Sequence, residues 1–284
     1  MHKYKKGEYR DQFVIAYITD LSNYKSVLFW AEKFALLLKK GIILLHISDD
    51  KYTKISTSEA SERLQQINKE INLPYTHSYV AMKGKSNEVI HSTGELLNGV
   101  MIISKLDNKT KSKSSPIAVN NVIKDFYSSR IAYFLFTDNV RENNNFEEIV
   151  LSMDSLKESK EKVLWASYFG RFANSIVDIY YHRYRDEYLQ KQLNLNIGFA
   201  RKMFKNFKIS TRNIHSQNRK TSTDIQAMDF AQREKKDVCI FQTTANKSFL
   251  EFFFGLTERK VLNKLDTTPV LFLNRRKDIF VMCE

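Results

Sequence analysis

An internal duplication is the feature of this 284-residue chain that most constrains its fold. The segment FVIAYITD at 13–20 ends in an aspartate, and so does the segment EEIVLSMD at 147–154. Matching segments recur roughly 134 to 138 residues apart along the chain, as expected for two structural units of one length. We therefore expect two similar domains in tandem, residues 1–140 and residues 141–284.

Each half alternates short apolar runs with helical patterns. The runs do not alternate strictly between apolar and polar residues, which is typical of parallel strands buried on both faces. They lie at 13–20, 42–48, 75–82, 100–104 and 131–137 in the first half, and at 147–154, 177–184, 208–216, 238–242 and 269–274 in the second. Each half thus reads βαβαβαβαβ, and the predicted fold class is α/β, with two tandem doubly wound parallel five-stranded sheets. The polar segment 138–147 is the expected linker.

The first helix of each half has an apolar face at i, i+3 and i+4 spacing. The predicted faces consist of Leu28, Ala31, Phe34, Ala35 and Leu38 in the first half, and of Leu164, Tyr168, Phe169 and Phe172 in the second. The last apolar runs, 131–137 and 269–274, would be a liability as bare sheet edges. We therefore expect them to pair, either within one chain as a pseudo-dimer or between chains as a homodimer.

The net charge of +13, from 45 Lys and Arg against 32 Asp and Glu, raises the question of a nucleic-acid partner. The excess divides into +6 in residues 1–140 and +7 in residues 141–284, and basic residues are interleaved with acidic ones. This even spread favours a basic soluble surface over a nucleic-acid site. No apolar run approaches the roughly 20 residues of a membrane span, and no secretory signal is visible, so we expect a cytoplasmic protein.

Metal and thiol chemistry find little support in the sequence. The two cysteines, Cys239 and Cys283, do not suggest a disulfide framework or a metal cage. Single histidines in the predicted strands, at 46, 77, 182 and 215, have no partner at a metal-binding spacing and are interpreted as strand residues. Paired catalytic carboxylates and a Ser/His/Asp order are also absent, so we expect a binding protein rather than a catalyst.

Two aspartates stand where an open parallel sheet binds its ligands. Asp20 and Asp154 each end the first strand of a half, and the loops after the fourth strands, 105–116 and 243–257, are expected beside them. Ligands bind beyond the carboxyl ends of strands where the strand order reverses. A carboxylate there accepts hydrogen bonds from an adenine amino group or a ribose hydroxyl, or it is a turn or cap residue.

The duplicated pattern, the strand-end aspartates, the second strand LLHIS and the closing ERKVLNKLDTTPVLFL resemble the universal stress protein (UspA-like) family in its tandem form. The resemblance covers about residues 12–137 and 146–274. It implies the adenine nucleotide alpha-hydrolase-like fold. It also implies that a loop of pattern G-x2-G-x9-G-[S/T] after the fourth strand cradles ATP phosphates, with the first-strand aspartate on the adenine side.

The second half departs from that loop pattern in DVCIFQTTANKSFLEFFFG (237–255). Gln242 and Ala245 stand at the first two glycine positions, Gly255 stands at the third, and Thr257 follows one place late. Glycine admits a positive φ and lets backbone N–H groups approach phosphate oxygens, so these substitutions weaken the cradle. ATP with Mg²⁺ in the second half, bound through Asp154, Gly255 and Thr257, remains an open alternative.

The first half departs further from the pattern. Its loop SKLDNKTKSKSSP has no glycine, and Ser104 and Asp107 occupy the corresponding places. The Asp107 carboxylate would repel phosphate, whereas the loop lysines Lys105, Lys109, Lys111 and Lys113 would attract it as point charges or form a solvated polar loop.

The sequence favours a stress-response binding or regulatory module with degenerate nucleotide loops. The first alternative is an adenine-nucleotide sensor or slow ATPase, and the second is a binder of nucleic acid or of an acidic partner. The apolar segment FLEFFF (249–254) is interpreted first as folding back over its own domain, and as a contact for a protein partner if it is exposed. The basic tail that follows residue 274 is interpreted as a mobile terminus or as a second such contact.

Overall fold

The computed structural model describes residues 12–107, 115–141, 144–156, 159–216, 221–243 and 257–274. Its strands are β1 (Phe13–Tyr17), β2 (Gly41–Ser48), β3 (His77–Lys83), β4 (Gly99–Lys105), β5 (Ala132–Phe136), β6 (Glu148–Ser152), β7 (Ile176–His182), β8 (Thr211–Ser216), β9 (Val238–Gln242) and β10 (Val270–Leu273). Its helices are α1 (Lys25–Leu38), α2 (Thr57–Asn68), α3 (Ser86–Leu96), α4 (Val119–Ser128), α5 (Ser159–Phe172), α6 (Glu187–Asn206), α7 (Thr223–Arg233) and α9 (Thr257–Asn263). Strands and helices alternate in the same order in both halves, as the repeat predicts.

Within the described residues the strands form one sheet in the order β3-β2-β1-β4-β5-β10-β9-β6-β7-β8. Neighbouring strands are parallel within each half, for example β1 with β2 and β4, and β6 with β7 and β9. The chain leaves the first strand of each half toward one neighbour and later returns on its other side. The strand order therefore reverses between β1 and β4, and again between β6 and β9.

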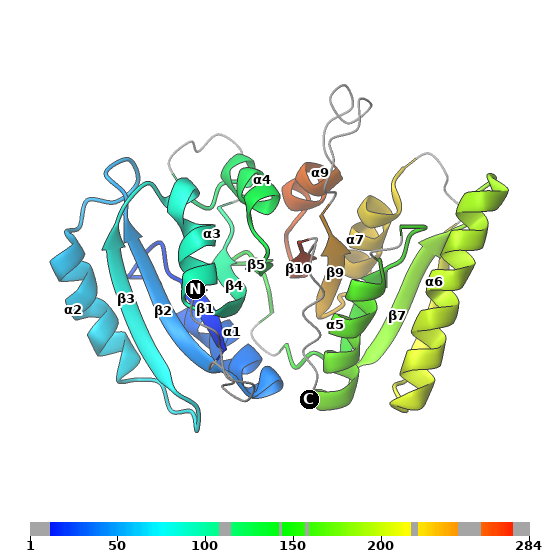
Figure 1. The fold of residues 1–284 in the computed structure, drawn as a ribbon, viewed down its shortest axis with the longest axis horizontal. Coiled ribbons are helices and arrows are strands. Elements are labelled where there is room, and N and C mark those ends of the chain that lie inside the picture. Colours follow the sequence, from blue (N-terminus) through cyan, green and yellow to red (C-terminus); the bar gives the residue numbers. More distant parts are fainter. Residues whose placement is uncertain are drawn as a thin grey trace, which may run out of the picture.

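The two halves are joined at the strands that were expected to pair. β5 and β10 run antiparallel, with Leu135 opposite Val270 and Tyr133 opposite Phe272. The predicted intramolecular pseudo-dimer is therefore confirmed, and the two five-stranded sheets continue into each other (Figure 1). This pairing satisfies the backbone groups of two edges that would otherwise be exposed.

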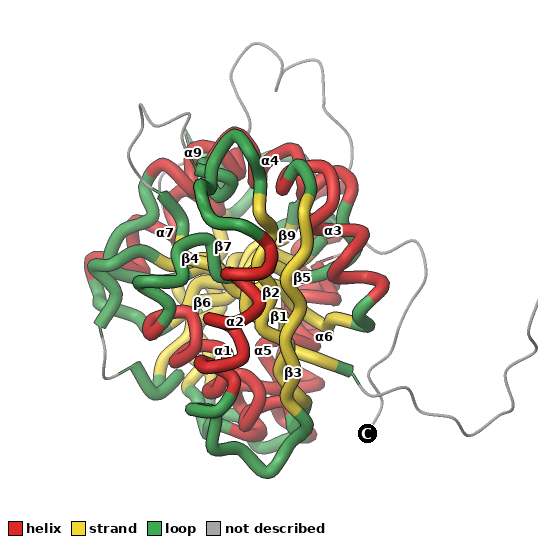
Figure 2. Tube along the Cα trace, turned by 90° about the vertical axis from the view of Figure 1, so that its left-hand side faces the viewer, coloured by secondary structure: helices red, strands yellow, loops and turns green. Residues whose placement is uncertain are grey.

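Helices cover both faces of the sheet. Helices α1, α2, α5 and α6 cover one face, and α3, α4, α7 and α9 cover the other, as the contacts between neighbouring helices and the two buried apolar clusters show. In Figure 2, α4 and α9 lie toward the top of the view, and α1 and α5 lie toward the bottom. Both apolar clusters contain residues of the two halves, so the core is continuous across the junction.

An aromatic cluster holds the junction on the α1–α5 face. Its members are Trp30, Phe34, Phe134, Phe146 and Phe169, with ring centroids 4.7–5.9 Å apart. These rings come from α1, β5, the linker and α5, and each is at most 4% exposed. Aromatic side chains bury large apolar areas, so this cluster contributes strongly to the docking of the halves.

The predicted buried face of α5 is partly wrong. Phe169 is fully buried, but Phe172 is 42% exposed and stacks on Tyr168 at the surface, with a centroid distance of 6.0 Å. The residues of α5 that face the sheet include Val163 and Ala166 instead. An apolar spacing identifies a helical stripe, but it does not decide which of two overlapping stripes the sheet covers.

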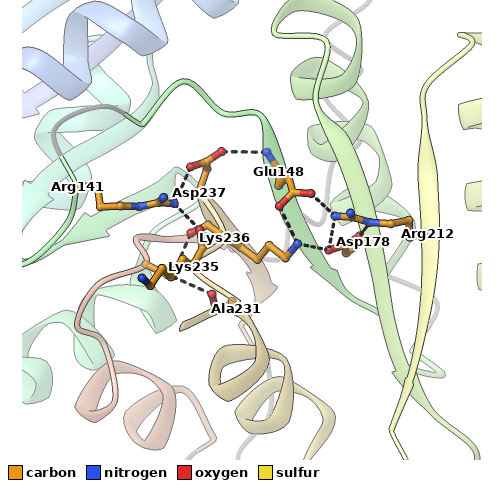
Figure 3. A network of polar contacts seen from close by, with 9 residues as sticks. Arg141, Glu148, Asp178, Arg212, Ala231, Lys235, Lys236 and Asp237 are labelled. Carbon is orange, nitrogen blue, oxygen red and sulfur yellow. Dashed lines mark hydrogen bonds and ion pairs between the residues drawn. The ribbon is translucent and has the colours of Figure 1, made fainter. Parts of the chain in front are cut away.

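An ion-pair network ties the linker to the second half at the start of its strands (Figure 3). Its charged members are Arg141, Glu148, Asp178, Arg212, Lys236 and Asp237. Lys236 Nζ lies 2.8 Å from Glu148, and its hydrogen bond is the main cause that lowers the pKa of that carboxyl. Arg141 of the linker pairs with Asp237 at 3.2 Å, so the expected polar linker is anchored where it enters β6.

Candidate functional site

The carboxyl ends of β6 and β9 define the candidate site of the second half. Asp154 follows β6 by two residues, and Gln242 is the last residue of β9. The two strands pair in parallel, with Leu151 opposite Ile240, so their ends lie side by side. The structure thus brings the strand end that carries Asp154 beside Gln242, which stands at the first glycine position of the degenerate loop after β9, as the sequence predicts.

Within this site the carboxylate of Asp154 is already engaged by the chain itself. Its Oδ1 accepts hydrogen bonds from the backbone N–H of Leu156, at 2.9 Å, and from the hydroxyl of Ser159. Its Oδ2 accepts a hydrogen bond from Lys162 Nζ at 3.0 Å. Burial alone would raise the pKa of Asp154, but the Lys162 ammonium and the hydrogen bonds outweigh burial and hold the pKa below its usual value.

Lys162 is the residue of this site that sequence reasoning missed. Its side chain is fully buried, which is rare for lysine unless the ammonium is paired. Lys162 lies eight residues after Asp154 on α5, whereas the residue eight positions after Asp20 is Leu28, which packs in the core. A lysine at the core position of one repeat, where the other repeat has leucine, is the signal that could have revealed it.

A second, half-buried acid adjoins this pair. Asp224, in the first turn of α7, accepts a hydrogen bond from the hydroxyl of Ser152 at the end of β6. Burial is the main cause that raises the pKa of Asp224, to about 6, against the opposing effect of Lys162. The fully buried ammonium of Lys162 therefore lies between the half-buried carboxylates of Asp154 and Asp224.

The degenerate loop between β9 and α9 is described only at its two ends. Gln242 is 7% exposed, and its Nε2 lies 3.4 Å from Glu161 Oε2 of α5. Gln242 therefore ends a strand and packs its side chain against α5. Thr257 opens α9 and is half-buried. Ala245, Gly255 and the segment FLEFFF lie outside the described residues.

In the first half Asp20 forms a turn at the surface. Its Oδ1 accepts hydrogen bonds from Ser22, at 2.9 Å from the backbone N–H and 2.5 Å from the hydroxyl. The hydroxyl bond is the main cause that lowers the pKa of Asp20. Asp20 is exposed, and among the residues that the structure describes it has no buried lysine partner like that of Asp154, so the two strand-end aspartates have different surroundings.

The loop after β4 offers little to a phosphate in the part that is described. Ser104 donates its hydroxyl to the backbone oxygen of Tyr17 at 2.9 Å, and Lys105 pairs with Asp138 at 2.9 Å. Asp107 forms a bridge with Ala118. Lys109, Lys111 and Lys113 lie outside the described residues, as do residues 275–284 of the basic tail and Cys283.

The histidines and the one described cysteine have structural surroundings. His46 is buried, with its Nδ1 2.7 Å from the backbone oxygen of Ile18, and His182 Nδ1 lies 2.5 Å from the hydroxyl of Thr223. Cys239 is buried in β9. In the part of the chain that the structure describes, no three His, Cys, Asp or Glu side chains are grouped to hold a metal ion. No helix there is long and apolar enough to cross a membrane.

A cavity of about 530 Å³ lies away from the reversal of strand order. It opens at the ends of β2 and β3 and the start of α3, and its lining includes Asp50, Lys83, Lys85 and Glu88. These residues pair among themselves, Lys83 with Asp50 and Lys85 with Glu88, each at 3.1 Å. The paired charges leave this cavity without a net preference for an anionic ligand.

Comparison with solved structures identifies the fold. The chain superposes on a universal stress protein from Archaeoglobus fulgidus DSM 4304 with a TM-score of 0.71 and 13% identity, over 94% of this chain and 97% of the other. It superposes on a putative universal stress protein from Pseudomonas aeruginosa UCBPP-PA14 with a TM-score of 0.64 and 14% identity, over 92% of each chain. No protein-family model and no curated protein matches the sequence. The chain therefore has the universal stress protein fold across both halves, as its sequence resemblance implies.

Proposed function

We propose that this chain, which has the universal stress protein fold in both halves, is a stress-response binding module that works without a nucleotide in its second half. The proposal rests on one observation: Lys162, Ser159 and the backbone of Leu156 already occupy the carboxylate of Asp154. The module acts by contacts with a protein partner rather than by catalysis, and we place it in the cytoplasm.

The energetics of the Asp154–Lys162 pair support this proposal. A nucleotide that displaced Lys162 from Asp154 would break an ion pair whose lysine is fully buried and would leave the Lys162 ammonium without its partner. Breaking a buried pair typically costs about 3–5 kcal/mol. Millimolar affinity corresponds to a binding free energy of only about 4 kcal/mol, so this cost alone would erase weak nucleotide binding.

The chemistry of the loop points the same way. In the family pattern that this chain resembles, glycines at the start of the loop expose backbone N–H groups to phosphate. Here Gln242 is a buried strand residue whose side chain contacts α5, and it adds bulk where that approach would begin. A nucleotide sensor or slow ATPase using the second half is the alternative, and it requires a ligand to reach Asp154 beside Lys162 or in its place.

Calorimetric titration with Mg-ATP at physiological salt tests the proposal. We expect no heat of binding up to millimolar ATP for the unmodified chain. The variants Asp154→Asn and Asp20→Asn, one in each half, report which half is responsible if heat appears. A dissociation constant tighter than about 0.1 mM, equivalent to roughly 5.5 kcal/mol, that is lost in Asp154→Asn but kept in Asp20→Asn would overturn it.

A further inference from the structure

Part of the positive charge of the chain is concentrated on and around α6. The segment 181–208, which contains α6, has seven basic residues, Arg183, Arg185, Lys191, Arg201, Lys202, Lys205 and Lys208, against only Asp186 and Glu187. All seven basic side chains are exposed. None forms an ion pair with any residue that the structure describes, although Arg201 donates a hydrogen bond to Asn213 at 3.1 Å. The even division of charge between the two halves of the sequence conceals this concentration.

The corresponding helix of the first half shows that the fold does not require this charge. Helix α2 occupies the same place between the second and third strands of its half, and α2 and α6 lie at opposite ends of the molecule (Figure 1). Residues 50–70, which contain α2, have four basic and four acidic residues. Arg63 there pairs with Glu59 at 2.8 Å. The basic surface is therefore specific to α6, which is also longer, with 20 residues against 12.

The exposed face of α6 has the pattern of a helix-packing seam. Residues spaced alternately by three and four positions form one solvent-facing stripe, called the seam below, in which two apolar side chains stand among lysines. They are Tyr188, Lys191, Leu195, Gly198, Lys202 and Lys205. Tyr188 is 65% exposed and Leu195 is 56% exposed, so apolar side chains stand among the cations on a helix whose opposite face is already buried.

Gly198 strengthens the case for a docked partner. Within the described chain, a Cβ at this position would meet no atom within 4 Å, so packing inside the protein gives no reason for a glycine. Glycine in a helix interior costs about 1 kcal/mol relative to alanine. A glycine on an open helix face allows another backbone to approach closely, as small residues do at helix–helix contacts.

We propose that the seam on α6 binds an acidic amphipathic helix of another protein. Leucine-type side chains of that helix would pack on Leu195 and Tyr188, its backbone would approach Gly198, and its carboxylates would pair with Lys191, Lys202 and Lys205. Helix-in-groove recognition uses anchors at this spacing. A helix of 20 residues is about 30 Å long, which gives the partner several turns of contact.

Other occupants fit the seam less well. A second copy of this chain would bring its own cations against these lysines and would be repelled. A nucleic-acid backbone would use the lysines but not Leu195 or the open space at Gly198. A membrane surface would have only two exposed apolar side chains of the seam to bury, whereas interfacial helices use a broad apolar face.

The test uses the full chain and a synthetic probe. The probe is a fluorescein-labelled peptide of about 20 residues with leucine at the a and d positions of its heptads and glutamate at the flanking positions. Fluorescence anisotropy gives its dissociation constant at several salt concentrations. We expect binding that weakens steeply as salt rises. A peptide with lysine in place of each glutamate serves as the control probe.

Two variants locate the site. The double variant Lys191→Glu with Lys202→Glu should weaken binding at least about tenfold, because two attractive pairs become repulsive. Lys54→Glu with Lys69→Glu changes the charge equally at the α2 end and should leave binding unchanged. Gly198→Gln keeps the charge and improves helix propensity, so it should fold normally, yet it should also weaken binding about tenfold by blocking close approach.

Three results would overturn the proposal. The first is no binding of the acidic peptide at low salt, or equal binding of the lysine-containing peptide. The second is unchanged affinity in Gly198→Gln, since a purely electrostatic surface is indifferent to that side chain. The third is tighter binding of a mixed-sequence RNA oligonucleotide, or of phosphatidylserine vesicles, that the α6 double variant abolishes.

Discussion

The stability of this protein should fall as the pH rises through neutrality because of one buried carboxyl. Asp125 of α4 is 1% exposed, and neither of its side-chain oxygens has a hydrogen-bond partner among the described residues. Burial is the main cause that raises the pKa of Asp125 from 3.8 to about 8, against a smaller opposing effect of Lys124. The acid is therefore protonated in the folded protein at neutral pH.

The sign of the effect follows from the raised pKa. Because the folded state holds the proton more tightly than the unfolded state, folding is favoured at low pH, and that advantage is lost as pH rises from about 4 to about 8. In the unfolded chain the carboxyl is ionised at pH 7, because pH 7 lies about three units above its ordinary pKa of 3.8. Each unit corresponds to about 1.4 kcal/mol, so the loss at pH 7 is on the order of 4 kcal/mol.

Urea denaturation of the wild type and of Asp125→Asn at pH 5, 6, 7 and 8 measures this loss. The amide cannot ionise, so the free energy of unfolding of the variant should fall less with pH than that of the wild type. We expect the variant to be the more stable protein at pH 8, by several kcal/mol. Asp50→Asn, at an exposed acid, should follow the wild-type profile. If the difference between wild type and Asp125→Asn does not grow from pH 5 to pH 8, the reasoning is refuted.

Two further perturbations test the buried pair and the junction between the halves. Lys162→Leu, which installs the residue found at the corresponding core position of the first half, should cost about 3–5 kcal/mol in denaturation, because it leaves the carboxylate of Asp154 unpaired. Adding Asp154→Asn should recover part of this loss; a double variant as unstable as the sum of the singles would contradict the pairing. The lowered pKa of Asp154 makes its contribution disappear on acidification, as pH falls below the usual aspartate range, which is opposite in direction to Asp125. Phe146→Ala should cost about 3–5 kcal/mol because it empties the centre of the aromatic cluster, and Trp30 fluorescence should report the loss. Survival of wild-type stability in Phe146→Ala would show that the halves dock without this cluster.

The sequence predicted the architecture because its evidence is periodic and repeated. The duplicated βαβαβαβαβ pattern, the positions of Asp20 and Asp154 at strand ends, and the pairing of 131–137 with 269–274 follow from strand and helix periods and from the cost of bare sheet edges. Local patterns identify the type and order of the elements here because the strands are short apolar runs and the helices have apolar faces, although they did not decide which stripe of α5 is buried.

The tertiary structure alone decided what surrounds those residues. The sequence left Asp154 open as a nucleotide contact or a turn residue, and only the packing of α5 places the fully buried Lys162 against its carboxylate, which is itself 20% exposed. Basic residues that are spread along 181–208 in the sequence come to lie on and beside the solvent-facing side of α6. Both outcomes depend on contacts between distant segments, and a linear pattern does not encode which side chain fills the space beside a buried charge.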